Sequence, residues 1–155
     1  MTFKTILFAT DFSESSDHAF QYALSLAKQY ASKLVVIHVI NEPVDLRGFY
    51  VPHISFDKLE EEIEQGAQKM MEQFCRTHML DFDNFASSVV PGIPHDEIIS
   101  KADEIDADLI VLGTHGRTGL DHVLFGSTAE KVVRKSTVPV MTRKIGLGEL
   151  KSDGN

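Results

Sequence analysis

Short apolar runs alternate with helical patterns along this chain, and this alternation constrains the fold more than any other feature. The runs lie at residues 5–10, 34–40, 82–90, 109–112 and 138–142. Their length and their β-branched residues are typical of buried strands, and the segments between them carry apolar residues at helical spacing. Strands that alternate with helices predict a parallel sheet covered by helices on both faces, with right-handed crossovers.

Each expected helix has one apolar face. The first helix carries Ala19, Tyr22, Ala23, Leu26, Ala27 and Tyr30, and the segment 11–13 supplies capping residues before it. The second, at about 57–78, carries Leu59, Ile63, Ala67, Met70, Met71 and Phe74. The third has Pro94 in its first turn and carries Ile98, Ile99, Ala102 and Ile105. The fourth ends near Lys135 and directs Val132 and Val133 inward.

Two of the five strands are expected at the edges of the sheet. The run 82–90 alternates only partly, and the segment 91–93 is expected to turn the chain after it. Pro139 lacks an N–H, so the last strand should lie at a sheet edge or at an interface. Residues 41–56 show no period, which fits either a binding loop or plain variable surface. We expect one domain over residues 1–145 and a loose tail over 146–155.

Charge and cysteine content narrow the classes of function. The net charge of -8 argues against nucleic acid and against an anionic membrane surface as partners. Cys75 is the only cysteine, so no intramolecular disulfide can form, and we expect a half-buried, inert thiol. No apolar stretch approaches the roughly 20 residues of a membrane helix, and no signal peptide is recognised. A cytoplasmic protein is expected.

A glycine-rich segment directly follows the fourth apolar run. Gly113, Gly116 and Gly126 are followed by Ser127 and Thr128, and a helical pattern then starts. Glycines let the backbone approach an anion, and the N–H groups at a helix start point toward it. The segment therefore predicts a phosphate site made largely of backbone, which an acidic protein can also offer.

The expected sheet places this segment beside two other strand ends. Ligands of doubly wound sheets bind beyond the carboxyl ends of the strands, where the strand order reverses. If the first and fourth strands are neighbours, the ends that meet there are Ala9, Thr10 and Asp11, then Val39, and then Leu112 and Gly113.

Other nucleotide signatures do not fit the chain. It contains no G-x-x-x-x-G-K-[ST] string, and its glycines follow the fourth strand instead of the first, which disfavours NAD. The HxGH signature of adenylyl-transferring enzymes is also missing. The scattered histidines indicate no separate metal site.

Three polar residues expected at the glycine-rich segment or at the strand ends beside it each allow two interpretations. Ser127 with Glu130 fits a capping box, which is compatible with an anion site at the same helix start. Asp11 could contact a ribose or Mg²⁺, or could only cap a helix. Arg117 could bind phosphate or be merely exposed.

These residues resemble the universal stress protein family, in its ATP-binding branch. The nucleotide motif of that branch, G-x2-G-x9-G-[ST], is met in full by Gly113, Gly116, Gly126 and Ser127. The resemblance covers nearly the whole chain, including the first run with Asp11, the end of the second run at His38 and Val39, and the segments 107–113 and 138–140. The turn 10–13 departs from the variants common in the family, and the loop 41–56 is variable there.

The resemblance implies a fold, a ligand and a partner. The fold is a three-layer, doubly wound α/β sheet of five parallel strands in the order 3-2-1-4-5, of the Rossmann-like, adenine-nucleotide alpha-hydrolase-like type. The ligand is ATP, expected with Mg²⁺. The partner is a second copy bound through the fifth strand at Val138, Val140 and Thr142, and a regulatory protein partner is left open. The predicted nucleotide contacts are Ala9, Thr10, Asp11, Val39, Leu112, Gly113, His115, Gly116, Arg117, Gly126, Ser127 and Thr128.

Three functions follow from this site in order of preference. The first is an ATP-binding module in regulation or stress response. The second is a slow ATPase or phosphotransferase, for which His115 and His122 are the available acid–base groups, although their spacing fits no catalytic pattern; we predict no catalytic residue. The third is a dimeric scaffold without nucleotide.

Overall fold

The computed structural model describes residues 1–41, 56–115 and 125–146. Residues 42–55 of the predicted loop 41–56, the residues Gly116, Arg117 and His122, and residues 147–155 of the predicted tail 146–155 lie outside this part. The described elements are, in chain order, β1 (Thr5–Ala9), α1 (Glu14–Tyr30), β2 (Lys33–Asn41), α2 (Phe56–His78), β3 (Phe85–Gly92), α3 (Pro94–Glu104), β4 (Leu109–Gly113), α4 (Ser127–Lys135) and β5 (Val140–Arg143).

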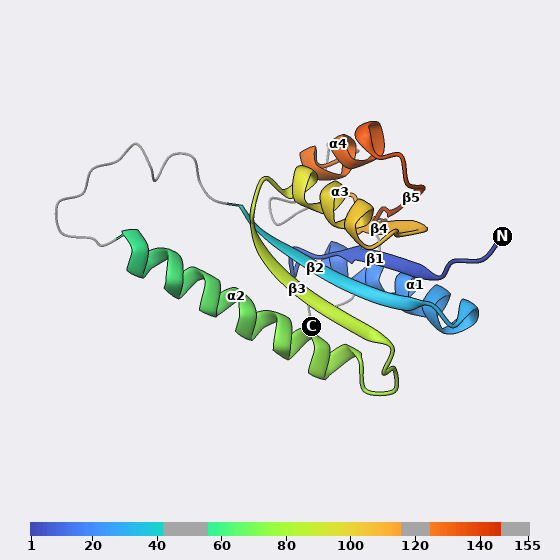
Figure 1. Ribbon diagram of the computed structural model, residues 1–155, viewed down its shortest axis with the longest axis horizontal. Helices are drawn as coiled ribbons and strands as arrows, with labels where there is room; N and C mark the ends of the chain where they lie inside the picture. Colours follow the sequence, from blue (N-terminus) through green and yellow to red (C-terminus); the bar gives the residue numbers. More distant parts are fainter. Residues whose placement is uncertain (42–55, 116–124, 147–155) are drawn as a thin grey trace.

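The strands form one parallel sheet in the order β3-β2-β1-β4-β5 (Figure 1), which confirms the predicted fold class and strand order. In the central pairs, Leu7 lies beside Val35 on one side and beside Ile110 on the other. The strand order reverses between β1 and β4, so the switch point lies where the sequence predicted it. At the opposite end of the sheet, the Asp108 carboxylate accepts hydrogen bonds from the Lys4 and Thr5 N–H groups, which joins the starts of these two strands.

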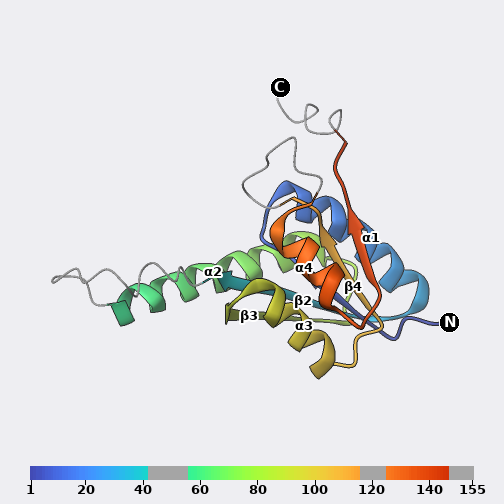
Figure 2. The ribbon, with the colours of Figure 1, turned by 90° about the horizontal axis from the view of Figure 1, so that it is seen from above.

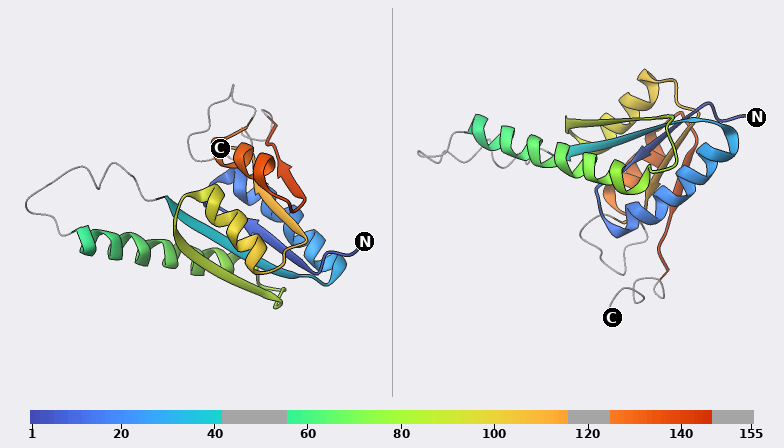
Figure 3. Two further views of the ribbon diagram at one scale, coloured as in Figure 1. Left: turned by 45° about the horizontal axis from the view of Figure 1, so that its top comes forward. Right: turned by 90° about the horizontal axis from the view of Figure 1, so that it is seen from below.

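Helices cover both faces of the sheet, as Figures 2 and 3 show. Alternate strand residues face opposite sides, because side chains in a strand have a period of two. Phe8, Val36 and Val111 share one core with α1 and α2, and Leu7, Ile37 and Ile110 share the other core with α3 and α4. Fully burying a side chain of this size contributes about 1.5–3 kcal/mol relative to leaving it exposed, so these two cores fix the sheet that carries the site.

The outer strands agree with two predictions and correct two others. β3 and β5 are the edges, as the partial alternation of 82–90 and Pro139 predicted. The predicted turn at 91–93 is wrong in its position, because β3 continues through Pro91 and Gly92, which lie beside Ile40 and Asn41. An edge strand tolerates this proline, since one side of the strand has no neighbour. The last strand begins at Val140 and not at residue 138.

Several side chains expected in the core are exposed instead. Tyr22 and Tyr30 of α1, Ile63 and Met70 of α2, and Val133 of α4 are each at least 38% exposed. The alanine positions of α1 and the residues Phe74 and Val132 are buried as predicted. The buried face of α1, α2 and α4 is therefore narrower than the sequence pattern of these helices.

Candidate functional site

A cavity of about 610 Å³ opens at the carboxyl ends of the strands beside the switch point. Its floor comes from the ends of β1, β2 and β4, and its walls come from α2, α3 and the first turn of α4. The described lining residues are Ala9, Thr10, Asp11, Ser16, Ile37, His38, Val39, Ile40, Asn41, Ile63, Gly66, Ala67, Met70, Pro94, Ile98, Leu112, Gly113, Thr114, His115, Gly126, Ser127, Thr128 and Ala129.

The Asp11 carboxylate is held in place by the start of α1. Its Oδ1 accepts hydrogen bonds from the Ser13 N–H at 2.9 Å and from the Ser16 hydroxyl at 2.6 Å. Ser13 is the N-cap of α1 and its hydroxyl accepts from the Ser16 N–H. Asp11 therefore supports the helix start, as one interpretation expected, and it also lines the cavity, while its contact with a ribose or Mg²⁺ stays a prediction.

At the cavity, the backbone of Val39 lies beyond the end of the ladder between β1 and β2. Along β2, Leu34 donates to Asn84 beside β3, whereas the Ile37 carbonyl accepts from Thr10 beside β1. Because hydrogen-bonding direction alternates in a parallel ladder, Val39 faces the β1 side, where β1 has already ended. Within the described residues no strand group pairs with it there, so its N–H and C=O could pair with the edge of a base.

Gly113 ends β4 against the first turn of α1. A Cβ at this position would lie 2.6 Å from the Ser15 hydroxyl oxygen and 2.9 Å from the Ser15 carbonyl oxygen. No side chain fits in this space, since Cβ contacts below about 3 Å essentially never occur. The first glycine of the motif is therefore required for packing as well as for the cavity wall.

The two ends of the glycine segment are joined by a backbone hydrogen bond. The Gly126 N–H donates to the carbonyl oxygen of Thr114, a buried residue. Thr114 is itself held by its N–H bond to the Arg143 carbonyl of β5 and by a bond between its hydroxyl and His115 Nδ1. The chain thus returns from residue 125 directly to the end of β4, which sets the start of α4 at the cavity.

The first turn of α4 offers backbone N–H groups to the cavity. Ser127, Thr128 and Ala129 all line it, and the first N–H groups of an α-helix have no acceptor within the helix. The predicted capping box is wrong: Gly126 is the N-cap, it provides no side-chain cap, and Glu130 pairs with Arg134 instead of reaching back. Because Ser127 is already inside the helix, its hydroxyl does not cap it.

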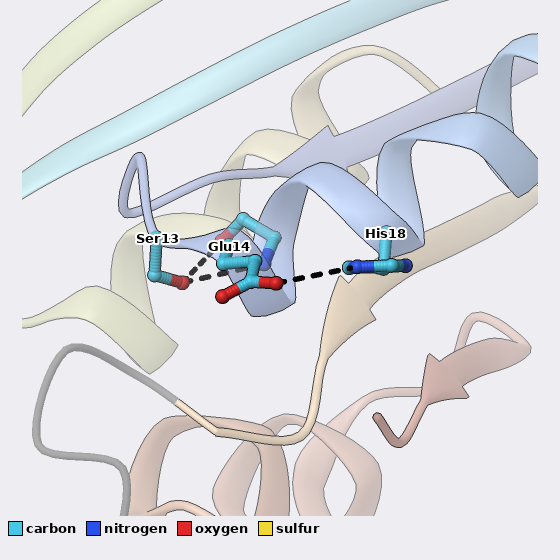
Figure 4. A network of polar contacts seen from close by, with 4 residues as sticks. Ser13, Glu14 and His18 are labelled. Atoms are coloured by element: carbon cyan, nitrogen blue, oxygen red, sulfur yellow. Dashed lines mark hydrogen bonds and ion pairs between the residues drawn. The ribbon is translucent and has the colours of Figure 1, made fainter. Parts of the chain in front are cut away.

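The starts of the other helices beside the cavity differ from that of α4. Figure 4 shows α1 with its own cap, Ser13, and with Glu14 in its first turn paired to His18. Burial raises the pKa of the Asp17 carboxyl, also in this turn, although His78 and His18 oppose the shift. α3 begins with Pro94, which has no N–H, and carries Asp96 and Glu97 in its first turn. α4 also carries an acidic residue in its first turn, Glu130, which pairs with Arg134. Among these three helices, however, α4 is the one whose start has neither a side-chain cap nor a proline, so its first N–H groups remain available to an anion.

The structure brings together ten of the twelve predicted contacts: Ala9, Thr10, Asp11, Val39, Leu112, Gly113, His115, Gly126, Ser127 and Thr128. The other two, Gly116 and Arg117, lie outside the described residues. The sequence analysis missed Ser16, His38 and Asn41, and it also missed the wall formed by Ile63, Gly66 and Met70 of α2. The spacing of these three α2 residues placed them on one helix face, but the pattern did not show that this face borders a cavity.

The described residues were also compared with what a metal centre and a membrane span require. No three of their His, Cys, Asp and Glu side chains come together as metal ligands. In the same part of the chain, no helix has the length and apolar character needed to cross a membrane.

Comparison with known proteins gives the family. The model of the universal stress protein family matches residues 2–144. The chain belongs to this family. Universal stress protein MJ0577 of Methanocaldococcus jannaschii is 30% identical over 154 residues, which span 92% of this chain and 95% of that protein. Its solved structure matches with a TM-score of 0.81 over 94% of this chain and 99% of that one.

Two members of the family were solved with nucleotides and share the fold. One, from Archaeoglobus fulgidus, is a complex with dAMP, 23% identical, with a TM-score of 0.64 over 92% of this chain and 98% of that one. The other is a complex with cAMP, 24% identical, with a TM-score of 0.62 over 92% of this chain and 97% of that one.

Proposed function

We propose that this universal stress protein binds ATP in the cavity at the switch point and acts as a nucleotide-dependent module in regulation or stress response. The observation that carries the proposal is the open first turn of α4, which faces the same cavity as Asp11 and the Val39 backbone. The proposed phosphate site at α4 and the polar groups of Asp11 and the Val39 backbone thus border the same cavity.

The described residues suit the three parts of an adenine nucleotide. The phosphates would lie at the N–H groups of Ser127 and Thr128, where the helix dipole favours negative charge. The ribose would lie near the Asp11 carboxylate. The base would lie between the Val39 backbone and apolar walls such as Ile98, and would have its edge satisfied by backbone groups. Two proteins of this fold that hold dAMP and cAMP support an adenine base here.

The site supports binding more than phosphoryl transfer. Transfer of a phosphoryl group is accelerated by cationic side chains and a positioned nucleophile. Among the described lining residues there is no lysine or arginine. Mg²⁺ would arrive with the triphosphate, and Asp11 is the described carboxylate of the cavity wall that could face it. We therefore rank a regulatory role above an ATPase.

We also propose a homodimer through β5. This strand is an edge of the sheet, and all four of its residues are partly exposed. Tyr22 of α1, whose ring lies under Arg143 of β5, is 48% exposed, and so is Val133 of α4, a helix that also contacts β5. An edge strand flanked by exposed apolar side chains suits pairing with a second copy.

Native mass spectrometry and calorimetry test the nucleotide proposal together. Protein purified without added nucleotide should carry an adenine nucleotide, and the stripped protein should bind ATP with measurable heat. ADP, AMP and cAMP belong in the same series because they share the base and ribose, and GTP is the control for the base. Absence of binding for every adenine nucleotide would refute the proposal and favour a nucleotide-free scaffold.

A further inference from the structure

His38 connects the end of β2 to the turn between β1 and α1. Its Nδ1 lies 2.8 Å from the carbonyl oxygen of Thr10. A carbonyl oxygen can only accept, so Nδ1 carries the hydrogen of this bond. The imidazole ring also lies against Phe12, with 4.5 Å between the ring centroids. His38 thus contacts the residues on both sides of Asp11.

The hydrogen bond between His38 and Thr10 lies just beyond the end of the ladder between β1 and β2. The last backbone bond between them runs from the Thr10 N–H to the Ile37 carbonyl at 2.9 Å. Beyond it the chain turns sharply: the Phe12 N–H donates to the Thr10 hydroxyl, and Phe12 has a left-handed φ of 63°. Thr10 is 5% exposed, and the carbonyl groups of buried residues are nearly always hydrogen-bonded. The His38 ring supplies the donor for this one.

We propose that His38 is a positioning residue of the nucleotide site. Its bond to Thr10 and its contact with Phe12 fix the direction of the peptide that carries Asp11, and so fix where the carboxylate stands relative to a ribose. This inference rests on the proposed nucleotide binding and deepens it, because it assigns a role to a side chain outside the phosphate motif. The phosphate end at α4 lies on another element and does not depend on this bond.

His78 provides a matched control for a merely structural role. Its ring lies 4.5 Å from Phe74 and 5.2 Å from Phe20, measured between centroids, so it packs on the same aromatic cluster that Phe12 joins. It does not line the cavity. Replacing either histidine with leucine disturbs the cluster, but only the His38 change disturbs the Asp11 turn.

The experiment compares two probes by calorimetry, with thermal stability measured beside them. The affinity for adenosine measures the part of the site that would hold base and ribose. The affinity for tripolyphosphate measures the part at the start of α4 that would hold the phosphates. His38→Leu should weaken adenosine binding about fivefold to tenfold, as expected for the loss of one hydrogen bond near a ligand, and leave tripolyphosphate binding unchanged. His78→Leu should leave both unchanged. His38→Asn keeps an N–H at the position of Nδ1 and should retain most of the adenosine affinity.

A second pair of variants covers the case in which His38→Leu does not fold. His38→Asn should bind adenosine more tightly than His38→Gln, whose amide lies one carbon farther from the backbone. Equal adenosine affinities in this pair, or equal affinities in His38→Leu and His78→Leu, would overturn the positioning role and leave ATP binding intact. Failure of the unmodified protein to bind ATP, adenosine or tripolyphosphate would overturn the proposed function and this inference together.

Discussion

The Ser15 hydroxyl oxygen lies 2.6 Å from the point that a Cβ on Gly113 would occupy. The first turn of α1 therefore rests directly on the end of β4, and the Ser15 hydroxyl also accepts a hydrogen bond from the His115 N–H at 3.4 Å. This contact sets the distance between the start of α1, to which Asp11 is hydrogen-bonded, and the end of β4, where the glycine segment begins.

Replacing Gly113 with alanine should destabilise the fold. The added methyl group would meet the Ser15 backbone, which cannot move aside as a flexible side chain can, so we expect a loss of about 1–3 kcal/mol in the free energy of unfolding. Urea denaturation would measure it. Gly66→Ala is the control, because a Cβ at Gly66 meets nothing within 4 Å. In a helix interior that change should stabilise by up to about 1 kcal/mol. Equal effects of the two substitutions would contradict the packing role of Gly113.

Replacing Ser127 with proline should weaken nucleotide binding without breaking α4. Proline is well accepted at the first helical position, and Gly126 already has φ -67° and ψ 158°, which suits a residue before proline. The change removes one N–H from the phosphate cradle, so we expect roughly tenfold weaker ATP binding by calorimetry.

The companion variant Ser127→Ala keeps that N–H. It should change helix stability by less than about 0.5 kcal/mol, because the Ser127 side chain does not cap the helix. If Ser127→Pro binds ATP as tightly as Ser127→Ala does, the start of α4 does not bind the phosphates.

Replacing Thr142 with lysine should separate the proposed dimer. Thr142 lies on the edge strand β5 beside Leu112, and pairing of two copies through β5 would bring two added positive charges near each other. Sedimentation velocity should show a shift from dimer to monomer, weaker at high salt because salt screens the repulsion. Lys28→Ala, far from β5 in an exposed pair with Asp81, should leave the oligomeric state unchanged. A Thr142→Lys protein that remains dimeric would place the interface elsewhere.

The Cys75 thiol should react slowly and should make stability depend on alkaline pH. Burial raises its pKa above the ordinary value of 9.0, with a hydrogen bond to Ser87 acting weakly in the opposite direction. The unfolded chain loses this proton first as pH rises, so stability is fully present below pH 9.0 and declines above it. Cys75→Ala should remove that part of the decline in urea titrations. Rapid alkylation of the native protein by iodoacetamide at pH 8 would contradict a protonated, half-buried thiol.

The strand positions could be predicted from the sequence because apolar β-branched runs and their spacing depend on local composition. The chemistry of the glycine segment was equally local: Gly113, Gly126 and Ser127 stand at spacings that fit a phosphate site before any contact is known. The edge positions of the outer strands also followed from local features, such as the missing N–H of Pro139.

Other features depended on contacts between distant residues. The sequence could not show that Ser15 excludes a side chain at Gly113, because this depends on how α1 packs on the end of β4. It also could not show that the Val39 backbone lies beyond the β1 ladder, because this depends on where β1 ends relative to β2. The exposure of Ile63 and Met70 was also missed, since helical spacing shows which residues share a face but not what lies opposite that face.

The sequence by itself determined the order of strands and helices and the residue types around a phosphate, because these depend on periodicity and on glycine. Only the tertiary structure decided that Gly126 and not Ser127 occupies the N-cap position of α4, and that His38 bonds to Thr10. The physical reason is that caps and hydrogen bonds depend on distances of a few ångströms between segments, which the packing of helices on the sheet sets.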